Sequence, residues 1–202
     1  MNRRELMAAA IIGAIAFPLL LIFAGAIVDA RVRASEAPFR AVLGNGRFEA
    51  LMSGEGGIPH YLGASLSAPE FTLPEQSGGN WSLADQRGKV VVMNFWTVTC
   101  RPCIQEMPTI ELLAEITKGW GDVEVVAVST DRDWAEVEAI IPAGSDIVSL
   151  LDADRAVVTE AFGTKLFPET WIIDKNGVVR LRFDGAFDWA SPVALDLIRA
   201  YR

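Results

Sequence analysis

A chain of 202 residues is long enough for one domain of ordinary size and an appendage, and 51% of its residues are hydrophobic. Residues 1–40 hold five arginines and three carboxylates, a net charge of +2, so the total of −8 leaves −10 on residues 41–202. Such an acidic part argues against nucleic acid as a partner and against broad contact with an anionic membrane surface.

The N-terminal segment 6–28 is a run of 23 residues without a charged side chain. As a helix it would span the roughly 30 Å apolar core of a bilayer, at about 1.5 Å of rise per residue. Arg3 and Arg4 precede it, as expected of a cytoplasmic N-terminus. We therefore expect residues 1–5 in the cytoplasm and a single-pass membrane anchor at 6–28, with the domain on the periplasmic or extracytoplasmic side.

A cleaved signal peptide is the alternative interpretation of the same run. Residues 28–30 would serve as the small-residue cleavage site, but the run is longer than the roughly 7–15 apolar residues of a signal peptide. In both interpretations the domain is exported. Export favours disulfides, because these bonds persist outside the cytoplasm.

Residues 29–65 are expected to form a linker, because glycines and prolines interrupt them repeatedly. Two apolar clusters, at 39–43 and 48–52, have helical spacing. They would pack on the domain or lie near the membrane, unless they belong to an irregular linker. The compact domain is expected at residues 66–202.

The pattern within residues 66–202 is that of an α/β domain. The β-branched run at 90–96 predicts a strand buried on both faces, and Pro102 marks the start of the next helix. Strands alternate with helices and then end in a hairpin, which predicts a mixed sheet with helices on both faces. The further elements expected in chain order are a hairpin around Ser77–Asn80, a helix to about 118, a strand at 123–128, helices at 133–141 and 155–162, strands at 170–174 and 178–183, and a helix that opens at Ser191.

The chain has two cysteines, Cys100 and Cys103, directly after the strand at 90–96. At a helix N-terminus Cys100 would meet unpaired N–H groups and the positive end of the helix dipole, which favour the thiolate, and Arg101 adds a cation. The thiolate is the attacking species, so we expect Cys100 to be the nucleophile and Cys103, about one turn on, to resolve the mixed disulfide. A structural pair is the alternative, although a staple over so short a loop stabilises little.

No metal or bound cofactor is expected, because the electrons would travel through the cysteines themselves. A zinc site needs four ligands, and His60, in the predicted linker, is the one other candidate beside the two cysteines.

The motif Asn-Phe-Trp-x-x-x-Cys-x-Pro-Cys at 94–103, followed by Glu106-Met107-Pro108, resembles the thioredoxin-like TlpA/ResA/CcmG family. The resemblance extends over 66–202 and includes the segments 68–71 and 163–170. It implies a thioredoxin fold with an N-terminal β-hairpin and a strand–helix insertion, preceded by one transmembrane helix. The implied function is that of an extracytoplasmic thiol–disulfide oxidoreductase that reduces disulfides of exported proteins, in several relatives for cytochrome c maturation, with electrons from a membrane donor.

The resemblance also assigns roles to residues outside the cysteine pair. Pro168 matches the cis-proline that faces the cysteines, so the Phe167–Pro168 bond is expected to be cis and to help hold a bound peptide. Glu106 matches a glutamate near the disulfide that tunes thiol acidity or moves protons, unless it is an ordinary solvated helix residue. Glu169 is expected to help select partners.

Two residues beside Cys100 depart from the family pattern. Thr99 stands where the family usually has tryptophan, and Arg101 replaces a glycine or glutamate. We expect both to contact substrate, and Arg101 to move the pair toward a more oxidising potential.

Two other functions remain open at this point. A peroxiredoxin-like thiol peroxidase would use Thr97, three residues before Cys100, but the proline typical of that class is replaced by Met93. A redox-inert binding module would use the disulfide only to hold the start of the helix.

Overall fold

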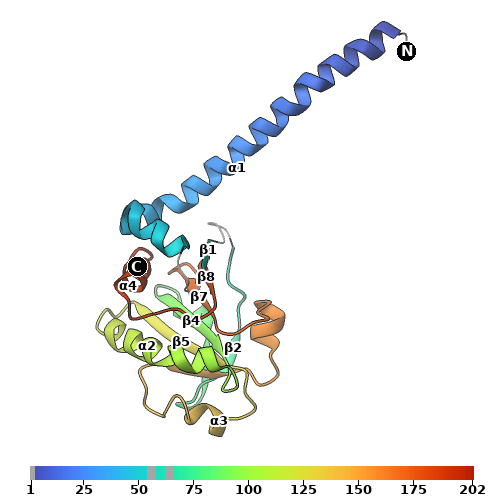
Figure 1. Ribbon diagram of the computed structural model, residues 1–202. Coiled ribbons are helices and arrows are strands. Elements are labelled where there is room, and N and C mark those ends of the chain that lie inside the picture. The colour runs from blue at the N-terminus through green and yellow to red at the C-terminus, as the bar shows by residue number, and fades with distance from the viewer. Residues whose placement is uncertain (1–2, 54–57, 62–65) are drawn as a thin grey trace. The chain divides into compact units, whose positions relative to one another are not determined.

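The computed structural model describes residues 3–53, 58–61 and 66–202 (Figure 1). The chain divides into two units, one that ends at Pro38 and one from Phe39 to Arg202. The second unit contains the sheet and the cysteines, and it includes residues that the sequence assigned to the linker.

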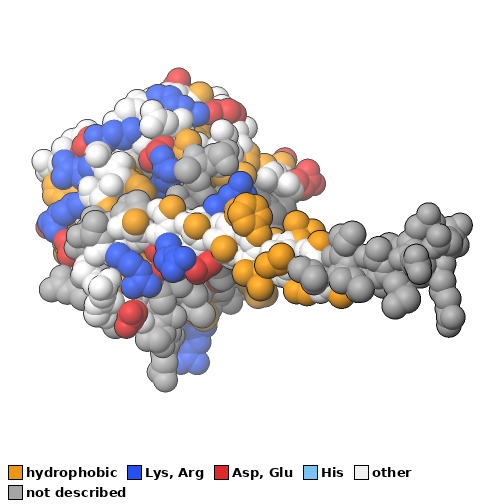
Figure 2. Space-filling model, turned by 90° about the horizontal axis from the view of Figure 1, so that it is seen from above, with side chains coloured by type: hydrophobic (Ala, Val, Ile, Leu, Met, Phe, Trp, Pro, Cys, Tyr) orange, Lys and Arg blue, Asp and Glu red, His pale blue; other side chains and the backbone are white. Residues whose placement is uncertain are grey.

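Helix α1 (Arg3–Ser53) contains the predicted anchor segment 6–28. Its described apolar side chains between Phe17 and Val28 are exposed, and Figure 2 shows them in orange along the helix. Within the described residues, none of the helices combines the length and the apolar character that a membrane crossing requires.

The predicted linker at 29–65 differs in its secondary structure from what the sequence suggested. Helix α1 continues to Ser53, with a non-helical backbone at Gly44, where φ is 72°. Strand β1 (Ile58–Tyr61) then pairs antiparallel with β8 (Val179–Asp184). Phe48 is buried in the core of the second unit, as expected if the apolar cluster at 48–52 packs on the domain. The side chains of His60 and of most other residues in this stretch lie outside the described part of the structure.

A six-stranded sheet forms the centre of the second unit, in the order β1-β8-β7-β4-β5-β6. Strand β4 runs parallel to β5 and antiparallel to β7, and a separate hairpin joins β2 to β3, so the mixed sheet and the hairpin are confirmed. The remaining strands are β2 (Thr72–Pro74), β3 (Asn80–Ser82), β4 (Val90–Trp96), β5 (Val123–Ser129), β6 (Val148–Leu151) and β7 (Glu169–Ile173).

The helices agree with the sequence at their starts more than at their ends. The predicted helix at 133–141 is too long, because α3 ends at Glu138, and the expected helix at 155–162 is a short π-helical segment, η2. Ser191 caps the last helix as predicted, by accepting a hydrogen bond from the backbone of Ala194. The helical segments are η1 (Leu83–Gln86), α2 (Arg101–Lys118), α3 (Trp134–Glu138), η2 (Ala156–Ala161) and α4 (Pro192–Arg199).

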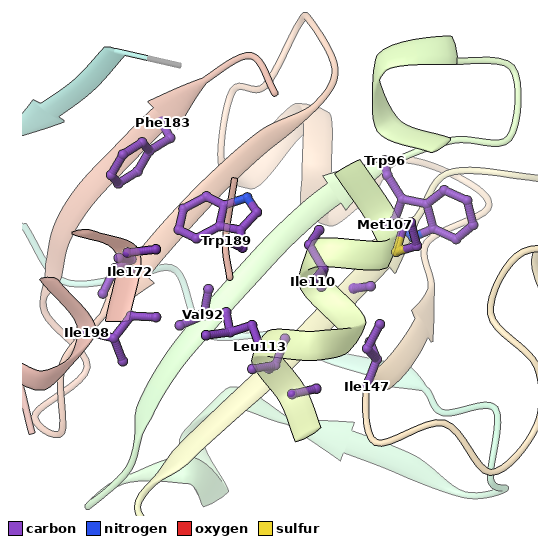
Figure 3. Packing of buried hydrophobic residues seen from close by; sticks show 14 of the residues in the cluster. Val92, Trp96, Met107, Ile110, Leu113, Ile147, Ile172, Phe183, Trp189 and Ile198 are labelled. Atoms are coloured by element: carbon purple, nitrogen blue, oxygen red, sulfur yellow. The ribbon is translucent and has the colours of Figure 1, made fainter. Parts of the chain in front are cut away.

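The core has two layers, one on each face of the sheet. Because side chains alternate along a strand, Val92 and Trp96 of β4 pack in one layer and Met93 and Phe95 in the other. The first layer lies between the sheet and helices α2 and α4 (Figure 3). Asn94, between Met93 and Phe95, therefore points to the face that α2 covers.

Candidate active site around the cysteine pair

The loops that carry the predicted site residues leave the sheet at one edge. Near the end of β4, Phe95 pairs with Glu169 at the start of β7, and Glu169 pairs in turn with Asp184 at the end of β8. The loop after β4 leads to Cys100, and the loop before β7 contains Pro168. Antiparallel pairing therefore brings together two segments that lie almost 70 residues apart in the sequence.

Cys100 and Cys103 form a disulfide, with their Cα atoms 5.3 Å apart. Cys100 is the N-cap of α2, and its Sγ accepts a hydrogen bond from the backbone N–H of Cys103 at 3.2 Å. Its predicted place at the helix N-terminus is confirmed. Cys103 is fully buried, at 0% exposure, whereas Cys100 is partly exposed. Of the two cysteines, Cys100 is therefore the one that an attacking molecule can approach.

Glu106 lies one turn beyond Cys103 on α2 and is only 4% exposed. The alternative of a solvated helix glutamate is therefore wrong. Its Oε1 accepts a hydrogen bond from Nδ2 of Asn94 at 2.7 Å, and its Oε2 accepts one from the backbone N–H of Phe187 at 2.9 Å. Burial disfavours the charged form and raises the pKa of Glu106 to about 7, although both hydrogen bonds and the nearby side-chain N–H of Trp189 act in the opposite direction. Near neutral pH this carboxyl group can both accept and release a proton.

The Phe167–Pro168 peptide bond is cis, as predicted. The carbonyl oxygen of Pro168 accepts a hydrogen bond from the backbone N–H of Gly185 at 3.0 Å, which ties this loop to the end of β8. Phe167 is partly buried and packs against both core layers. The neighbouring Leu166, which the sequence did not single out, is 82% exposed.

Glu169 is buried rather than displayed on the surface, at 7% exposure. It accepts hydrogen bonds from the hydroxyl of Thr164 and, at 2.7 Å, from Nε1 of Trp171. Burial raises its pKa above the usual range. Glu169 also lines a hollow of about 560 Å³ beside the cis-proline, and the lining residues are Gly163, Lys165, Leu166, Phe167, Pro168, Glu169, Arg182, Asp184 and Gly185.

Thr99 and Arg101 are both exposed on either side of Cys100. The hydroxyl of Thr99 lies 3.4 Å from that of Thr97. Arg101 has no ion-pair partner within the described ranges. Both side chains are therefore accessible to a protein that docks on Cys100.

Sequence reasoning missed two buried polar residues that support this site. Asn94 bonds to Glu106, and Asp131, 6% exposed, accepts hydrogen bonds from the hydroxyl of Thr97 at 2.5 Å and from the N–H of Val98 at 3.0 Å. A signal existed for each. Asn94 is the one polar residue in an apolar strand, and Asp131 follows the strand parallel to β4.

In the part of the chain that the structure describes, no three His, Cys, Asp or Glu side chains are grouped so that they could hold a metal ion.

Comparison with known proteins supports, in sequence and in fold, the family that the sequence motifs resemble. The Redoxin family model matches residues 64–198. The chain is 34% identical over 117 residues to the thioredoxin-like protein YneN of Bacillus subtilis, and 35% identical over 114 residues to the thiol-disulfide oxidoreductase ResA of Geobacillus thermodenitrificans. Each alignment covers 56% of this chain, and it covers 66% of YneN and 65% of ResA, just under two thirds of each relative.

A solved structure supports the fold over a larger share of its chain. This structure, of a Chlorobium tepidum protein described as a thiol:disulfide interchange protein DsbE, matches with a TM-score of 0.59 at 27% identity. The match covers 68% of this chain and 96% of that one. The predicted thioredoxin-like α/β fold is confirmed, and the chain belongs to the redoxin family, in its TlpA/ResA/CcmG group.

Proposed function

We propose that this protein is a thiol–disulfide oxidoreductase that reduces disulfides of exported proteins through Cys100 and Cys103. The observation that carries the proposal is the difference between the two sulfurs: Cys100 is accessible at the start of α2, and Cys103 is fully buried behind it. Glu106, with a pKa of about 7, lies one turn further along the same helix. The names of the relatives ResA and DsbE support the same reaction.

The reaction begins from the dithiol form. The thiolate of Cys100 attacks a sulfur of the substrate disulfide, so that a mixed disulfide forms and one substrate thiolate leaves. Glu106 then takes the proton of Cys103, whose thiolate attacks the Sγ of Cys100 and releases the second substrate thiolate. Two electrons have passed to the substrate, the leaving thiolates take up protons, and the Cys100–Cys103 disulfide seen in the structure is the oxidised product.

The partners of this reaction follow from where the domain would operate. We propose that residues 6–28 anchor the protein in the cell membrane by one helix, with the domain on the periplasmic or extracytoplasmic side. The length and lack of charge of this segment, which lies inside α1, support the anchor. A membrane electron donor would return the disulfide to the dithiol form, and apocytochrome c is one candidate client, as in several members of this group.

A trapping experiment with the full chain tests the proposal. In Cys103→Ala the mixed disulfide cannot resolve, so clients should accumulate as covalent adducts of Cys100, which mass spectrometry can identify. Cys100→Ala is the matched control and should trap none. Equal trapping by both variants would contradict the assigned roles. Rapid peroxide turnover would instead favour the peroxidase, and a reduction potential below about −300 mV would favour the inert module.

A further inference from the structure

Asn94 is a buried amide in a strand whose other side chains are all apolar. It is 1% exposed, and its Nδ2 donates hydrogen bonds to Oε1 of Glu106 at 2.7 Å and to Oγ1 of Thr170 at 2.8 Å. Burying an amide destabilises a fold unless the group finds partners. Here the partners belong to α2 and to β7, which starts directly after the cis-proline.

We infer that Asn94 is a positioning residue for the proposed exchange reaction, because its amide holds the Glu106 carboxyl group in place. The amide rotates by half a turn when that group gains or loses its proton. The inference rests on the proposed function, in which Glu106 takes the proton of Cys103. It adds a residue that acts on the reaction through the Glu106 carboxyl group.

The hydrogen bonds of Glu106 determine which oxygen carries the proton. The backbone N–H of Phe187 faces Oε2 and can only donate, so the neutral form carries its proton on Oε1, toward Asn94. With the amide as it stands, that proton would face the N–H group of Nδ2. Two donors cannot bond to each other, so the observed orientation fits the ionised form of Glu106.

The unused atom of the amide provides the other orientation. Oδ1 of Asn94 is buried and has no hydrogen-bond partner in the described structure. A half turn about the terminal bond of Asn94 places Oδ1 where Nδ2 was. Oδ1 then accepts from the protonated Glu106 and from the Thr170 hydroxyl, since a hydroxyl can donate as well as accept. One amide atom lacks a partner in either orientation, so the half turn need not add a further unsatisfied group.

No charged side chain contributes to the pKa of Glu106. The groups that face it are the titratable Cys103 one turn earlier on α2, the Asn94 amide of β4, and the backbone of Phe187 in the segment after β8. Thr170 of β7 is linked to Glu106 by hydrogen bonds through Asn94. The side-chain N–H of Trp189, in the same segment as Phe187, also lowers the pKa of Glu106, although it makes no hydrogen bond in the described structure. Of the Asn94 and Trp189 side chains, Asn94 is the one that lies within hydrogen-bond distance of the carboxyl group, at 2.7 Å.

The test measures how the resolving step depends on pH in the full chain, as the rate at which Cys103 releases a thiol from a preformed mixed disulfide. The rate should rise with pH through an inflection at the pKa of Glu106. Asn94→Leu removes the donor to the ionised carboxylate, so this inflection should move upward by about one to two pH units, with a roughly tenfold slower rate below it. In Asn94→Asp two neighbouring carboxyl groups share one proton, so their titrations are coupled and the pH profile should show two inflections. Thr170→Val keeps the bond from Asn94 to Glu106 and should leave the inflection in place.

The same variants in a Glu106→Gln background separate positioning from a general loss of structure. There Asn94→Leu should cause no further shift, because no proton remains to be placed. The side-chain amide resonance of Asn94 in the wild type should also change with pH at the inflection seen in the rates.

The possible failures are distinguishable. If the wild type exchanges disulfides and folded Asn94→Leu keeps the wild-type inflection, the inference is overturned and the proposed function stands. If Asn94→Leu does not fold, the isosteric Asn94→Asp decides, and a single unshifted inflection overturns the inference. A wild type that exchanges no disulfides overturns the proposed function itself, and the inference with it.

Discussion

The carboxyl group of Glu106 accepts a hydrogen bond from the backbone N–H of Phe187 at 2.9 Å, across 81 residues of sequence. Phe187 packs with Phe183 and Trp189 in a cluster whose ring centroids lie 5.0–5.2 Å apart. Phe183 belongs to β8, whereas Phe187 and Trp189 belong to the segment after β8, which supplies the hydrogen bond to Glu106. The cluster packs in the same core layer as α2. The segment after β8 therefore helps to set the acidity of a group on a distant helix.

Phe187→Ala should lower the pKa of Glu106 toward 4.5, because the loss of the ring lets water approach while the backbone N–H still donates. The pH dependence of the resolving step should move in the same direction, and stability should fall by about 1–3 kcal/mol. Phe71→Ala is a matched control, because Phe71 belongs to the core layer on the other face of the sheet. An equal shift of the Glu106 pKa in both variants would contradict a specific role for the Phe187 ring.

Glu106→Gln should change how stability depends on pH. Burial raises the folded-state pKa from 4.5 to about 7, so the folded state holds a proton that the unfolded state has lost between those values. The stability that this group contributes is full below pH 4.5 and is lost as the pH rises through 7. The loss is about 3 kcal/mol.

Urea unfolding of the oxidised protein at pH 4, 6 and 8 measures this effect. Glu106→Gln cannot ionise, so it should match the wild type at pH 4 and exceed it at pH 8. The difference between the two proteins removes the contributions of other buried carboxyl groups, such as Glu169, whose pKa is also raised by burial. A constant difference across this pH range would contradict the raised pKa.

The parts of the fold that depend on local pattern could be predicted, and those that depend on distant partners could not. The β-branched run of β4 has the predicted bounds, Val90–Trp96. Strand β1 is four residues long, and its pairing with β8, more than 100 residues away, leaves no local signal. Helix α3 ends at Glu138, three residues before the predicted end.

The candidate site divides in the same way. The cysteines at the start of α2 and the cis bond at Pro168 could be predicted, because spacing and family motif place them. Asn94 and Asp131 could not, because each acts through a side-chain contact between different elements of the fold. A polar residue in a buried strand indicates that a partner exists without telling which one.

Arg101→Glu should make the cysteine pair more reducing. A cation beside Cys100 stabilises its thiolate, and so the dithiol form, relative to the disulfide. Arg101 is exposed, so solvent weakens the effect, and the reduction potential should fall by roughly 10–30 mV. Equilibration with glutathione measures this potential.

Lys118→Glu is the matched control for this charge reversal. Lys118 lies at the last position of α2, about 25 Å of helix from Cys100, and its exposed ion pair with Asp146 contributes little to stability. Its reversal should leave the potential unchanged. Equal shifts at the two ends of α2 would show that the net charge of the domain sets the potential, and not the neighbour of Cys100.

Asp131→Ala should slow the attack by Cys100 without changing the resolving step. The Asp131 carboxylate accepts hydrogen bonds from Thr97 and Val98, in the loop that leads from β4 to Cys100, and also from Ser129. Its removal leaves buried donors without partners, which should cost about 1–3 kcal/mol of stability and loosen the loop. The second-order rate constant of the reduced protein with a small aromatic disulfide reports the attack directly.

Asp131→Asn separates loop geometry from charge. The amide oxygen can still accept from the N–H of Val98, so this variant should recover much of the rate if Asp131 acts by holding the loop. If the negative charge matters instead, both variants should raise the reactivity of Cys100, because both remove an anion that disfavours its thiolate. A slower alanine variant beside a nearly normal asparagine variant would assign to Asp131 the role of holding Thr97–Thr99 in front of the reactive sulfur.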